Sequence, residues 1–228
     1  MGAVRSYRIV FSKTGRIRFI GHLDLTQALR RAIKRASVPV KYSKGFNPHM
    51  EFSVAMPLSL GMEGFGEYAD LMVNDETEQF DSEKIALSLK ETVPAGIEIL
   101  KVFLIPAGSK SSAATIEKAE FTVVLPEFDD FEFVSKRVEK ILKAKEIVVC
   151  KKTKKAETLT DIRADIFNLE AFKTDSSVEI KMTLSAGSLR NLKPSLVLDC
   201  LMTGGNFDIT ALNNAKYVRN RLILSGQN

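Results

Sequence analysis

The chain has 228 residues, of which 45% are hydrophobic and 27% are charged, a composition that excludes a wholly disordered protein. No run of about 18 apolar residues occurs, so we expect no membrane-spanning segment and no membrane partner. The net charge of +5 is unevenly distributed: residues 1–50 carry 11 Lys or Arg and one acid, whereas residues 51–100 carry 2 Lys and 11 acids.

The first half of the chain alternates between strand and helix patterns. Apolar residues that recur every second position predict strands, and a spacing of three to four positions predicts helices. In chain order we predict strands at 4–12 and 16–20, a helix at 22–37, a loop at 42–49, a strand at 50–60, a turn around Gly61, Gly64 and Gly66, a strand at 68–73, a helix at 81–92 and a strand at 97–105. This order is the β-α-β-β-α-β order of a ferredoxin-like unit.

The second half repeats this order with one extra strand. Residues 106–114 are rich in Gly, Ser and Ala and are interpreted as a linker. The segments predicted after it are a strand at 121–125, a helix at 129–143, strands at 147–150, 162–167 and 178–184, a helix from Pro194 to Thr203 and a strand at 217–224. We therefore predict an α+β protein with two ferredoxin-like halves and antiparallel sheets, divided into a basic N-terminal domain, 1–106, and a C-terminal domain, 115–228.

The predicted helix at 22–37 has an apolar side and a basic side. At 100° per residue, Leu25, Leu29 and Ile33 fall on one arc, and four basic residues fall on the opposite arc. Phosphate binding requires several cations on one surface, so this pattern favours an anionic partner such as RNA. Two alternatives stay open. The basic side could be an ordinary solvated helix face, or the acidic segment 51–100 could pack beside it and neutralise it.

Basic residues on both sides of this helix extend the predicted nucleic-acid interface. The predicted phosphate-binding set is Arg16, Arg18, Arg30, Arg31, Lys34, Arg35, Lys41 and Lys44. In the loop at 42–49, aromatic and amide side chains lie next to cations, a combination that stacks unpaired bases; Tyr42, Phe46 and Asn47 are the candidates for contacting bases or a partner. The alternative is that both rings anchor the loop in the core.

The sequence contains no constellation that specifies a reaction. His22 and His49 are the only histidines and could act as general base and acid in RNA cleavage, or could simply orient the helix start and the loop. Cys150 and Cys200 are interpreted as two buried free thiols in a reducing cytoplasm, because a zinc or iron–sulfur site needs clustered ligands. We predict no metal and no cofactor, and leave open whether the chain is an enzyme.

Residues 16–70 carry motifs that resemble a bacterial family. The motifs are Arg16–Leu25, Arg30–Ala32, Tyr42–His49 and Pro57–Gly61. They are similar to the "radical SAM-linked" domain of unknown function, which is found beside or fused to radical SAM proteins. The resemblance implies an accessory component for a separate radical SAM partner, and the chain lacks the three-cysteine cluster motif of such an enzyme.

Together these features predict a cytoplasmic RNA-binding accessory protein that works with a radical SAM enzyme in RNA modification or processing. Two alternatives remain. The first is a protein-interaction module that docks the radical SAM partner without RNA. The second is a metal-independent endoribonuclease that uses His22 or His49.

Overall fold

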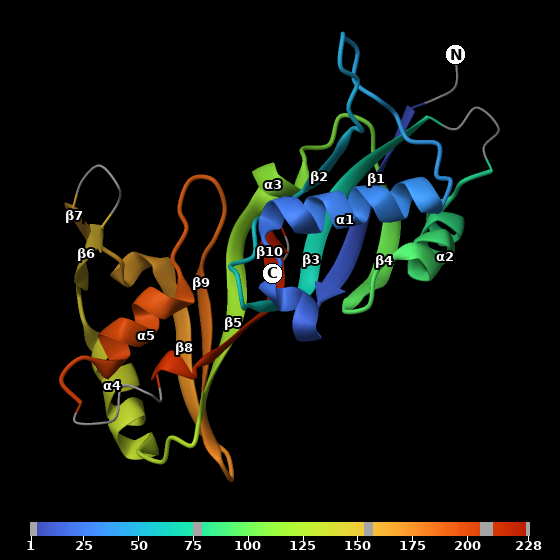
Figure 1. Ribbon diagram of the computed structural model, residues 1–228. Helices are drawn as coiled ribbons and strands as arrows, with labels where there is room; N and C mark the ends of the chain where they lie inside the picture. The colour runs from blue at the N-terminus through green and yellow to red at the C-terminus, as the bar shows by residue number, and fades with distance from the viewer. Residues whose placement is uncertain (1–3, 75–78, 153–156, 206–211, 227–228) are drawn as a thin grey trace. The chain divides into compact units, whose positions relative to one another are not determined.

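The computed structural model describes residues 4–74, 79–152, 157–205 and 212–226. The chain folds into two compact units (Figure 1). Unit 1 comprises Met1–Ile116 and Leu224–Gln227, and unit 2 comprises Glu117–Ile223 and Asn228. Both units combine helices with antiparallel strand pairs, which confirms the α+β class.

Unit 1 contains a four-stranded sheet and two principal helices. Its elements are β1 (Val4–Lys13), a 3-10 helix (Gly15–Phe19), α1 (His22–Arg35), β2 (Phe52–Val54), β3 (Glu63–Asn74), α2 (Ser82–Thr92), β4 (Ile97–Ile105) and the short α3 (Ser112–Thr115). Strand β1 pairs with β3 on one side and with β4 on the other, and β2 pairs with β3; all three pairings are antiparallel.

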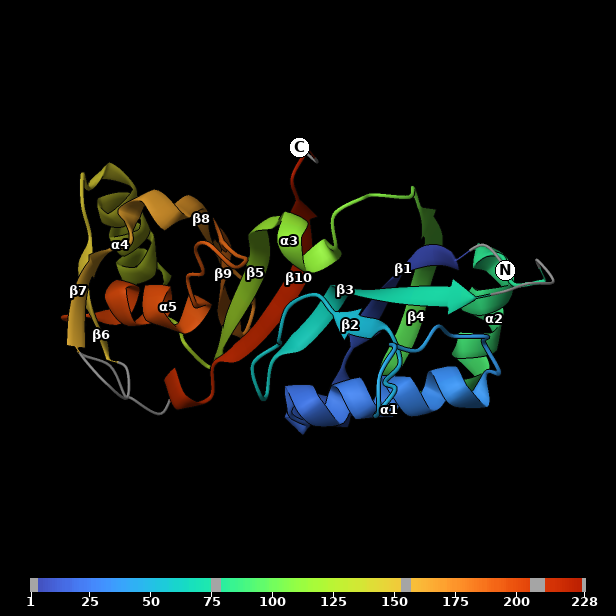
Figure 2. The same ribbon diagram turned by 90° about the horizontal axis from the view of Figure 1, so that it is seen from above.

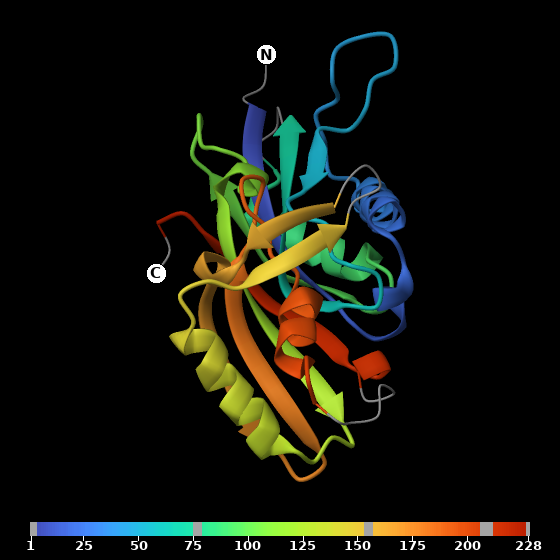
Figure 3. The same cartoon turned by 90° about the vertical axis from the view of Figure 1, so that its left-hand side faces the viewer.

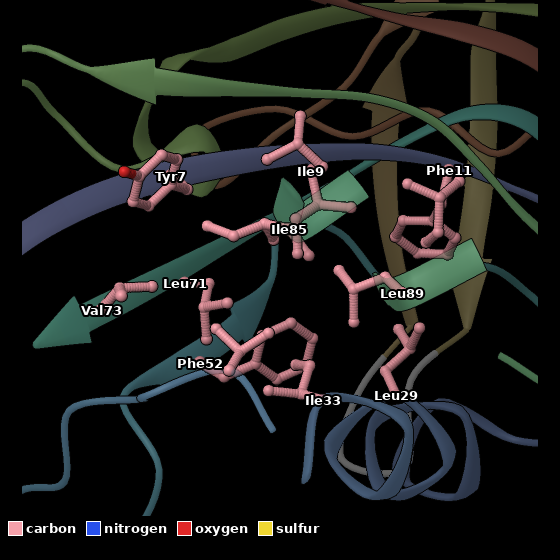
Figure 4. Packing of buried hydrophobic residues seen from close by; sticks show 14 of the residues in the cluster. Tyr7, Ile9, Phe11, Leu29, Ile33, Phe52, Leu71, Val73, Ile85 and Leu89 are labelled. Atoms are coloured by element: carbon pink, nitrogen blue, oxygen red, sulfur yellow. The ribbon is translucent and has the colours of Figure 1, made fainter. Parts of the chain in front are cut away.

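The core of unit 1 lies between this sheet and the two helices. In Figure 1, α1 passes in front of β3, β1 and β4. Figure 4 shows the side chains that fill the space between them, drawn from both helices and from β1, β2 and β3: Tyr7, Ile9, Phe11, Leu29, Ile33, Phe52, Leu71, Val73, Ile85 and Leu89. Because successive strand residues point to opposite faces, the alternate residues Ser6, Asp70 and Met72 lie on the face away from this core.

Helix α1 forms where the sequence predicts it. Leu25, Leu29, Ala32 and Ile33 are buried, which confirms the predicted apolar face. Gly21 is the N-cap residue in an extended conformation, and Asp24 lies in the first turn, where a carboxylate interacts favourably with the helix dipole. The helix ends at Arg35, before Ser37 adopts a positive φ of 53° and Pro39 prevents continuation.

The predicted strand at 16–20 is wrong, because this segment forms a 3-10 helix. Two buried or half-buried side chains hold the turn. The ammonium group of Lys13 donates hydrogen bonds to the carbonyl oxygens of Arg18 (3.3 Å) and Ile20 (3.0 Å). The carboxylate of Glu63 accepts one from the backbone N–H of Gly15 (2.9 Å). The alternation of polar and apolar residues over five positions is a local pattern, and it carries no information about these tertiary contacts.

Three further boundaries in unit 1 differ from the prediction. Strand β2 covers only Phe52–Val54 of the predicted 50–60, and β3 begins at Glu63, so Gly64 and Gly66 belong to a strand instead of a turn. The end of the predicted linker 106–114 is part of the fold. Ser112 there is buried and starts α3, and its backbone N–H donates to Asp70 Oδ2 (2.6 Å).

Unit 2 has the same kinds of element in a longer order. These are β5 (Ile116–Pro126), α4 (Phe131–Lys143), β6 (Val148–Lys152), β7 (Glu157–Asp161), a 3-10 helix (Arg163–Asp165), β8 (Ile166–Lys173), β9 (Ser177–Ser185), α5 (Pro194–Met202) and β10 (Lys216–Leu224). Four of its strands follow the order β10-β5-β9-β8, while β6 and β7 form a separate two-stranded sheet. Helix α4 contacts β8 and α5 (Figure 3).

Two sequence predictions in unit 2 need correction. Residues 162–167 are not one strand, because Arg163–Asp165 form a 3-10 turn in which buried Asp165 accepts from Ser185 Oγ (2.7 Å) and pairs with Arg190 (2.9 Å). Neither cysteine is fully buried as predicted. Cys200 is half-buried, and burial raises the pKa of its thiol, whereas Cys150 is exposed on β6.

Candidate nucleic-acid interface

The basic side of α1 is open within unit 1. Arg31, Lys34 and Arg35 are exposed and Arg30 is half-buried, all on the arc opposite the core-facing leucines. Figure 2 shows the helix from above, lying along the edge of unit 1. Lys34 and Arg35 lie in the last turn, where cations also interact favourably with the helix dipole. That local effect accounts for two of the four cations and leaves Arg30 and Arg31 without a helix-capping role.

Most of these cations have no protein partner. In the described part of unit 1, no ion pair or hydrogen bond is found for the side chains of Arg30, Arg31 or Lys34, while Arg35 donates to the Thr92 carbonyl (2.5 Å). The Nε of Arg30 is shielded from solvent and lacks a hydrogen-bond partner. An unpaired, partly desolvated guanidinium is costly, and an anionic ligand would offset that cost.

The acidic segment 51–100 neutralises other cations. Its carboxylates pair with Arg8 through Asp70 (2.8 Å), with Arg18 through Glu63 (3.2 Å) and with Lys41 through Glu51 (3.0 Å). These contacts lie on the sheet, the 3-10 helix and the segment that leads into β2. The described part of the acidic segment therefore partly neutralises the predicted interface at Arg18 and Lys41 and forms no ion pair with the cations of α1; Asp75, Glu76 and Glu78 lie outside the described residues.

The 3-10 helix gives Arg16 and Arg18 a different setting from the one predicted. Arg16 is exposed, whereas Arg18 is half-buried and lies over the Phe19 ring, 4.7 Å from its centroid. The turn precedes α1, whose 14 residues at 1.5 Å each separate it from Arg35 by about 20 Å. Arg16 and Arg18 thus flank one end of the helix and do not belong to the cluster at Arg30–Arg35.

The loop at 42–49 is a stiffened projection, here called the finger, which consists of residues 41–50 (Figures 1 and 3). Tyr42 and Met50 form an isolated antiparallel bridge, and the Ser43 N–H donates to the His49 carbonyl (2.9 Å). The Ser43 hydroxyl also lies 2.8 Å from His49 Nδ1 and accepts from the His49 N–H (3.1 Å). These contacts hold the base of the finger and leave its tip to adopt the conformation that Gly45, with a φ of 130°, permits.

The finger displays the side chains predicted to contact a ligand, Tyr42 at its base and the others toward its tip. Phe46 is fully exposed, Tyr42 is 43% exposed, and Lys44 and Asn47 are exposed. Neither the Tyr42 ring nor the Phe46 ring is buried, so neither anchors the loop in the core as the alternative interpretation required. Because the Phe46 ring is fully exposed, it contributes nothing to the core and is accessible to a ligand.

The two histidines lie in separate surroundings and do not form one site. His22 opens α1, and its Nδ1 is buried without a hydrogen-bond partner, so it does not cap the helix through its side chain. His49 lies at the base of the finger, where Ser43 orients its ring. No hydrogen bond connects the two imidazoles in the described part of the chain. Their proposed roles in cleavage therefore remain predictions without a shared site.

Two surface features escaped the sequence prediction. The first is an exposed apolar patch, Phe19, Leu23 and Leu60, at the N-terminal end of α1; the Phe19 ring approaches Gly61, next to Leu60. Leu23 falls on the polar arc of the helix, so a helical projection of the sequence could have revealed that this leucine is exposed. The second is a cleft lined by segments far apart in the chain, for which no sequence signal exists.

The described residues show no feature of a metal site or of a membrane-spanning helix. They contain no group of three or more His, Cys, Asp or Glu side chains arranged to hold a metal ion. Among the helices in this part of the chain, none has both the length and the apolar character required to cross a membrane.

Comparison with known proteins identifies a family but no activity. The family model described as "Uncharacterized protein conserved in bacteria (DUF2344)" matches residues 6–194. None of the curated proteins matches the sequence. A chain from the crystal structure of a Cbf5-Nop10-Gar1 complex has a similar fold, with a TM-score of 0.50, 10% identity and coverage of 95% of this chain and 48% of that chain.

This chain therefore spans about half the length of that structural neighbour. A second solved structure, of an unknown protein from Galdieria sulphuraria, is 14% identical over 97% of this chain and 100% of that chain, with a TM-score of only 0.27. At such identities the likeness to the first structure concerns the fold alone.

Proposed function

Because the chain belongs to this family of uncharacterized bacterial proteins, we propose its function from the geometry of unit 1: it is an RNA-binding accessory protein. The observation that carries the proposal is the basic face of α1, where Arg30, Arg31 and Lys34 have no partner in the described part of unit 1. Several unpaired cations on one rigid helix can bind successive phosphates and release their counterions. The density of arginine favours phosphate, because the guanidinium group binds two oxygens at once.

The finger would supply contacts to bases. The fully exposed Phe46 ring and the half-exposed Tyr42 ring offer stacking surfaces, and Lys44 and Asn47 beside them offer hydrogen-bond donors. Unpaired bases stack on such rings in single-stranded RNA. Because the Ser43–His49 contacts already brace the finger, less conformational entropy is lost when a base binds. RNA with unpaired nucleotides is therefore the expected ligand class.

A test compares matched charge reversals on two helices. Arg31→Glu/Lys34→Glu alters α1, and Lys136→Glu/Lys140→Glu alters two exposed cations of α4 in unit 2. Fluorescence anisotropy with a short single-stranded RNA would follow the salt dependence of binding. We expect the α1 variant to lose most affinity and to flatten the slope of log affinity against log salt by about 1.4, at about 0.7 for each lost phosphate contact. An unchanged slope in the α1 variant, or an equal loss in the α4 variant, rejects the proposal.

A specific observation favours a second candidate, a protein-docking role. Phe19, Leu23 and Leu60 are all exposed apolar side chains near the N-terminal end of α1, the other end from the basic cluster, and exposed apolar surface is a feature of protein-interaction sites. The resemblance to radical SAM-linked proteins gives this candidate a partner, a separate radical SAM protein. The structural neighbour also comes from a multiprotein complex. Recovery of a radical SAM protein on the wild-type chain after nuclease treatment, and its loss with Leu23→Asp, would support docking; equal recovery on both would reject it.

The ribonuclease alternative has less support than either candidate. It depends on His22 or His49, and these side chains have separate surroundings. A His22→Ala/His49→Ala variant that cleaves RNA like the wild type would end it.

The finer classification of the fold is also a proposal. In unit 1 the pairings give the strand order β4-β1-β3-β2, and in unit 2 the order β10-β5-β9-β8 has the same form if β6 and β7 are an insertion. We propose that both units are ferredoxin-like, with domains near residues 1–106 and 115–228. A crystal structure with a different strand order in either unit would reject this.

A further inference from the structure

A cleft of about 570 Å³ opens on unit 1, on the face of the sheet away from α1 and α2. Its walls come from four parts of the chain: Ser6 on β1, the residues from His49 to Ser53, the residues from Asp70 to Met72 on β3, and the end of β4 with the segment that leads from it to α3, visible in green in Figure 2. Its volume lies within the range of roughly 300–1,000 Å³ that is usual for small-molecule sites. None of the residues proposed to bind RNA through α1 lines it.

A buried ion pair fixes the cleft in shape. The Arg8 guanidinium pairs with Asp70 (Nε to Oδ1, 2.8 Å) and donates to the Lys110 carbonyl (3.2 Å). Asp70 Oδ2 accepts from the Ser112 N–H (2.6 Å). These bonds tie the segment after β4 to the sheet, so the cleft is formed before any ligand arrives. They also neutralise Asp70, the carboxylate at the floor of the cleft.

The remaining charges of the cleft favour an anion. Glu51 is paired with Lys41 (3.0 Å), so neither acid of the lining carries an uncompensated charge. Lys110, at the rim, has no acidic partner in the described part of the chain. Ser109 and Ser111, its chain neighbours, also line the cleft; the Ser111 hydroxyl caps α3 by accepting from the Ala114 N–H (3.4 Å), which leaves Ser109 as the serine proposed to contact a ligand. His49 also lines the cleft, and Ser43 holds its ring through Nδ1 (2.8 Å).

The rest of the lining is apolar. Met72 is 38% exposed and lines the cleft together with Ile105 and Pro106, and the core residues Met50, Phe52 and Leu71 also contribute to the lining. A methionine thioether makes favourable contacts with aromatic rings. The cleft therefore combines a cation and a serine, Lys110 and Ser109, with an apolar surface suited to a flat ring, and Ser6 and Ser53 also line it.

We propose that this cleft binds a nucleotide, with the phosphate at Lys110 and Ser109 and the base against Met72 and Ile105. The nucleotide is either a free nucleoside monophosphate or the phosphorylated terminal residue of an RNA strand, since both present the same chemistry. The site is independent of the α1 basic face, because the two share no residue.

Isothermal titration calorimetry on the full chain tests this with AMP, GMP, CMP and UMP, with adenosine and inorganic phosphate as partial ligands. We expect at least one monophosphate to bind more tightly than either partial ligand. Lys110→Glu should weaken that binding about tenfold or more, the loss expected for one charge-assisted contact, and should leave the affinity for adenosine unchanged. Lys90→Glu, an exposed cation on α2, is the matched control and should bind like the wild type.

Three outcomes would overturn the proposal: no heat with any monophosphate, inorganic phosphate binding as tightly as the nucleotides, or equal binding by Lys110→Glu and the wild type. A 5′-phosphorylated and a 5′-hydroxyl RNA of one sequence distinguish the two sources, because only an RNA-terminal site prefers the first. The Arg31→Glu/Lys34→Glu variant separates this proposal from the RNA proposal. It should keep nucleotide binding even though its α1 face is reversed.

Discussion

Helices α1 and α4 are close counterparts that use their charges in opposite ways. Each buries one apolar stripe against the sheet of its own unit, and each carries four basic residues: α1 has one acid and α4 has two, so their net charges are +3 and +2. In α4, Lys136 pairs with Glu132 (3.6 Å), Lys143 pairs with Glu139 (3.0 Å), and Arg137 donates to the last carbonyls of α5. Among the residues that the structure describes, Arg35 is the only cation of α1 with such a partner.

The difference shows that a count of basic residues does not identify a binding face. The cations of α4 stabilise α4 itself and the end of α5, as i,i+4 pairs and cap-like contacts do. The cations of α1 repel one another and gain little in return within unit 1. A surface that retains unpaired charge at such a cost is the better candidate for a ligand site, and the following predictions test that contrast.

The largest effect on stability should come from changes in the apolar stripe through which α1 packs on the sheet. Ile33 is 1% exposed, and Ile33→Ala removes buried methyl groups and leaves a cavity, so we expect a loss of about 2–5 kcal/mol in the free energy of unfolding, measured by urea denaturation. Leu23→Ala on the same helix is the control, because Leu23 is 78% exposed and should change stability by about 0.5 kcal/mol or less. Equal losses of unfolding free energy in the two variants would mean that α1 does not pack on the sheet through Ile33.

Replacement of Arg137 should have a smaller effect, and it should change stability without changing RNA affinity. Its guanidinium donates to the carbonyl oxygens of Leu201 (2.9 Å) and Cys200 (2.6 Å), so Arg137→Met should cost about 1.5–3 kcal/mol of unfolding free energy by leaving the end of α5 without these donors. RNA affinity should not change, because this cation is already engaged. A variant that folds normally but binds RNA more weakly would break the contrast between the two helices.

The sequence predicts such elements unevenly, for physical reasons. Helix α1 and strand β4 have long, regular periodicity, and β4 occupies the predicted 97–105. The five residues at 16–20 alternate just as regularly, yet Lys13 and Glu63 bend them into a 3-10 turn through contacts that no local pattern records.

The candidate sites divide in the same way. The basic arc of α1 is readable from a helical projection because all its members lie on one element. The cleft is not readable, because Arg8, Asp70 and Ser112 meet across the sheet from positions more than 40 residues apart. Whether a cation is paired is also hidden in the sequence. The residues of α1 and α4 look alike in the sequence, and only the structure shows which cations are paired.

The smallest effect on stability, and the sharpest test, comes from giving α1 the pairing that α4 has. Gln27 is exposed and lies four residues before Arg31, so Gln27→Glu places an acid in the favourable i,i+4 orientation. We expect the free energy of unfolding to rise by about 0.2–0.5 kcal/mol while RNA affinity falls, because Arg31 is then neutralised. The converse variant, Glu132→Gln/Glu139→Gln, unpairs two lysines of α4 and should weaken stability without increasing RNA affinity, since α4 lacks the arginine cluster and the finger. If that variant gains as much affinity as Gln27→Glu loses, RNA responds to net charge alone, and the α1 face is not a specific site.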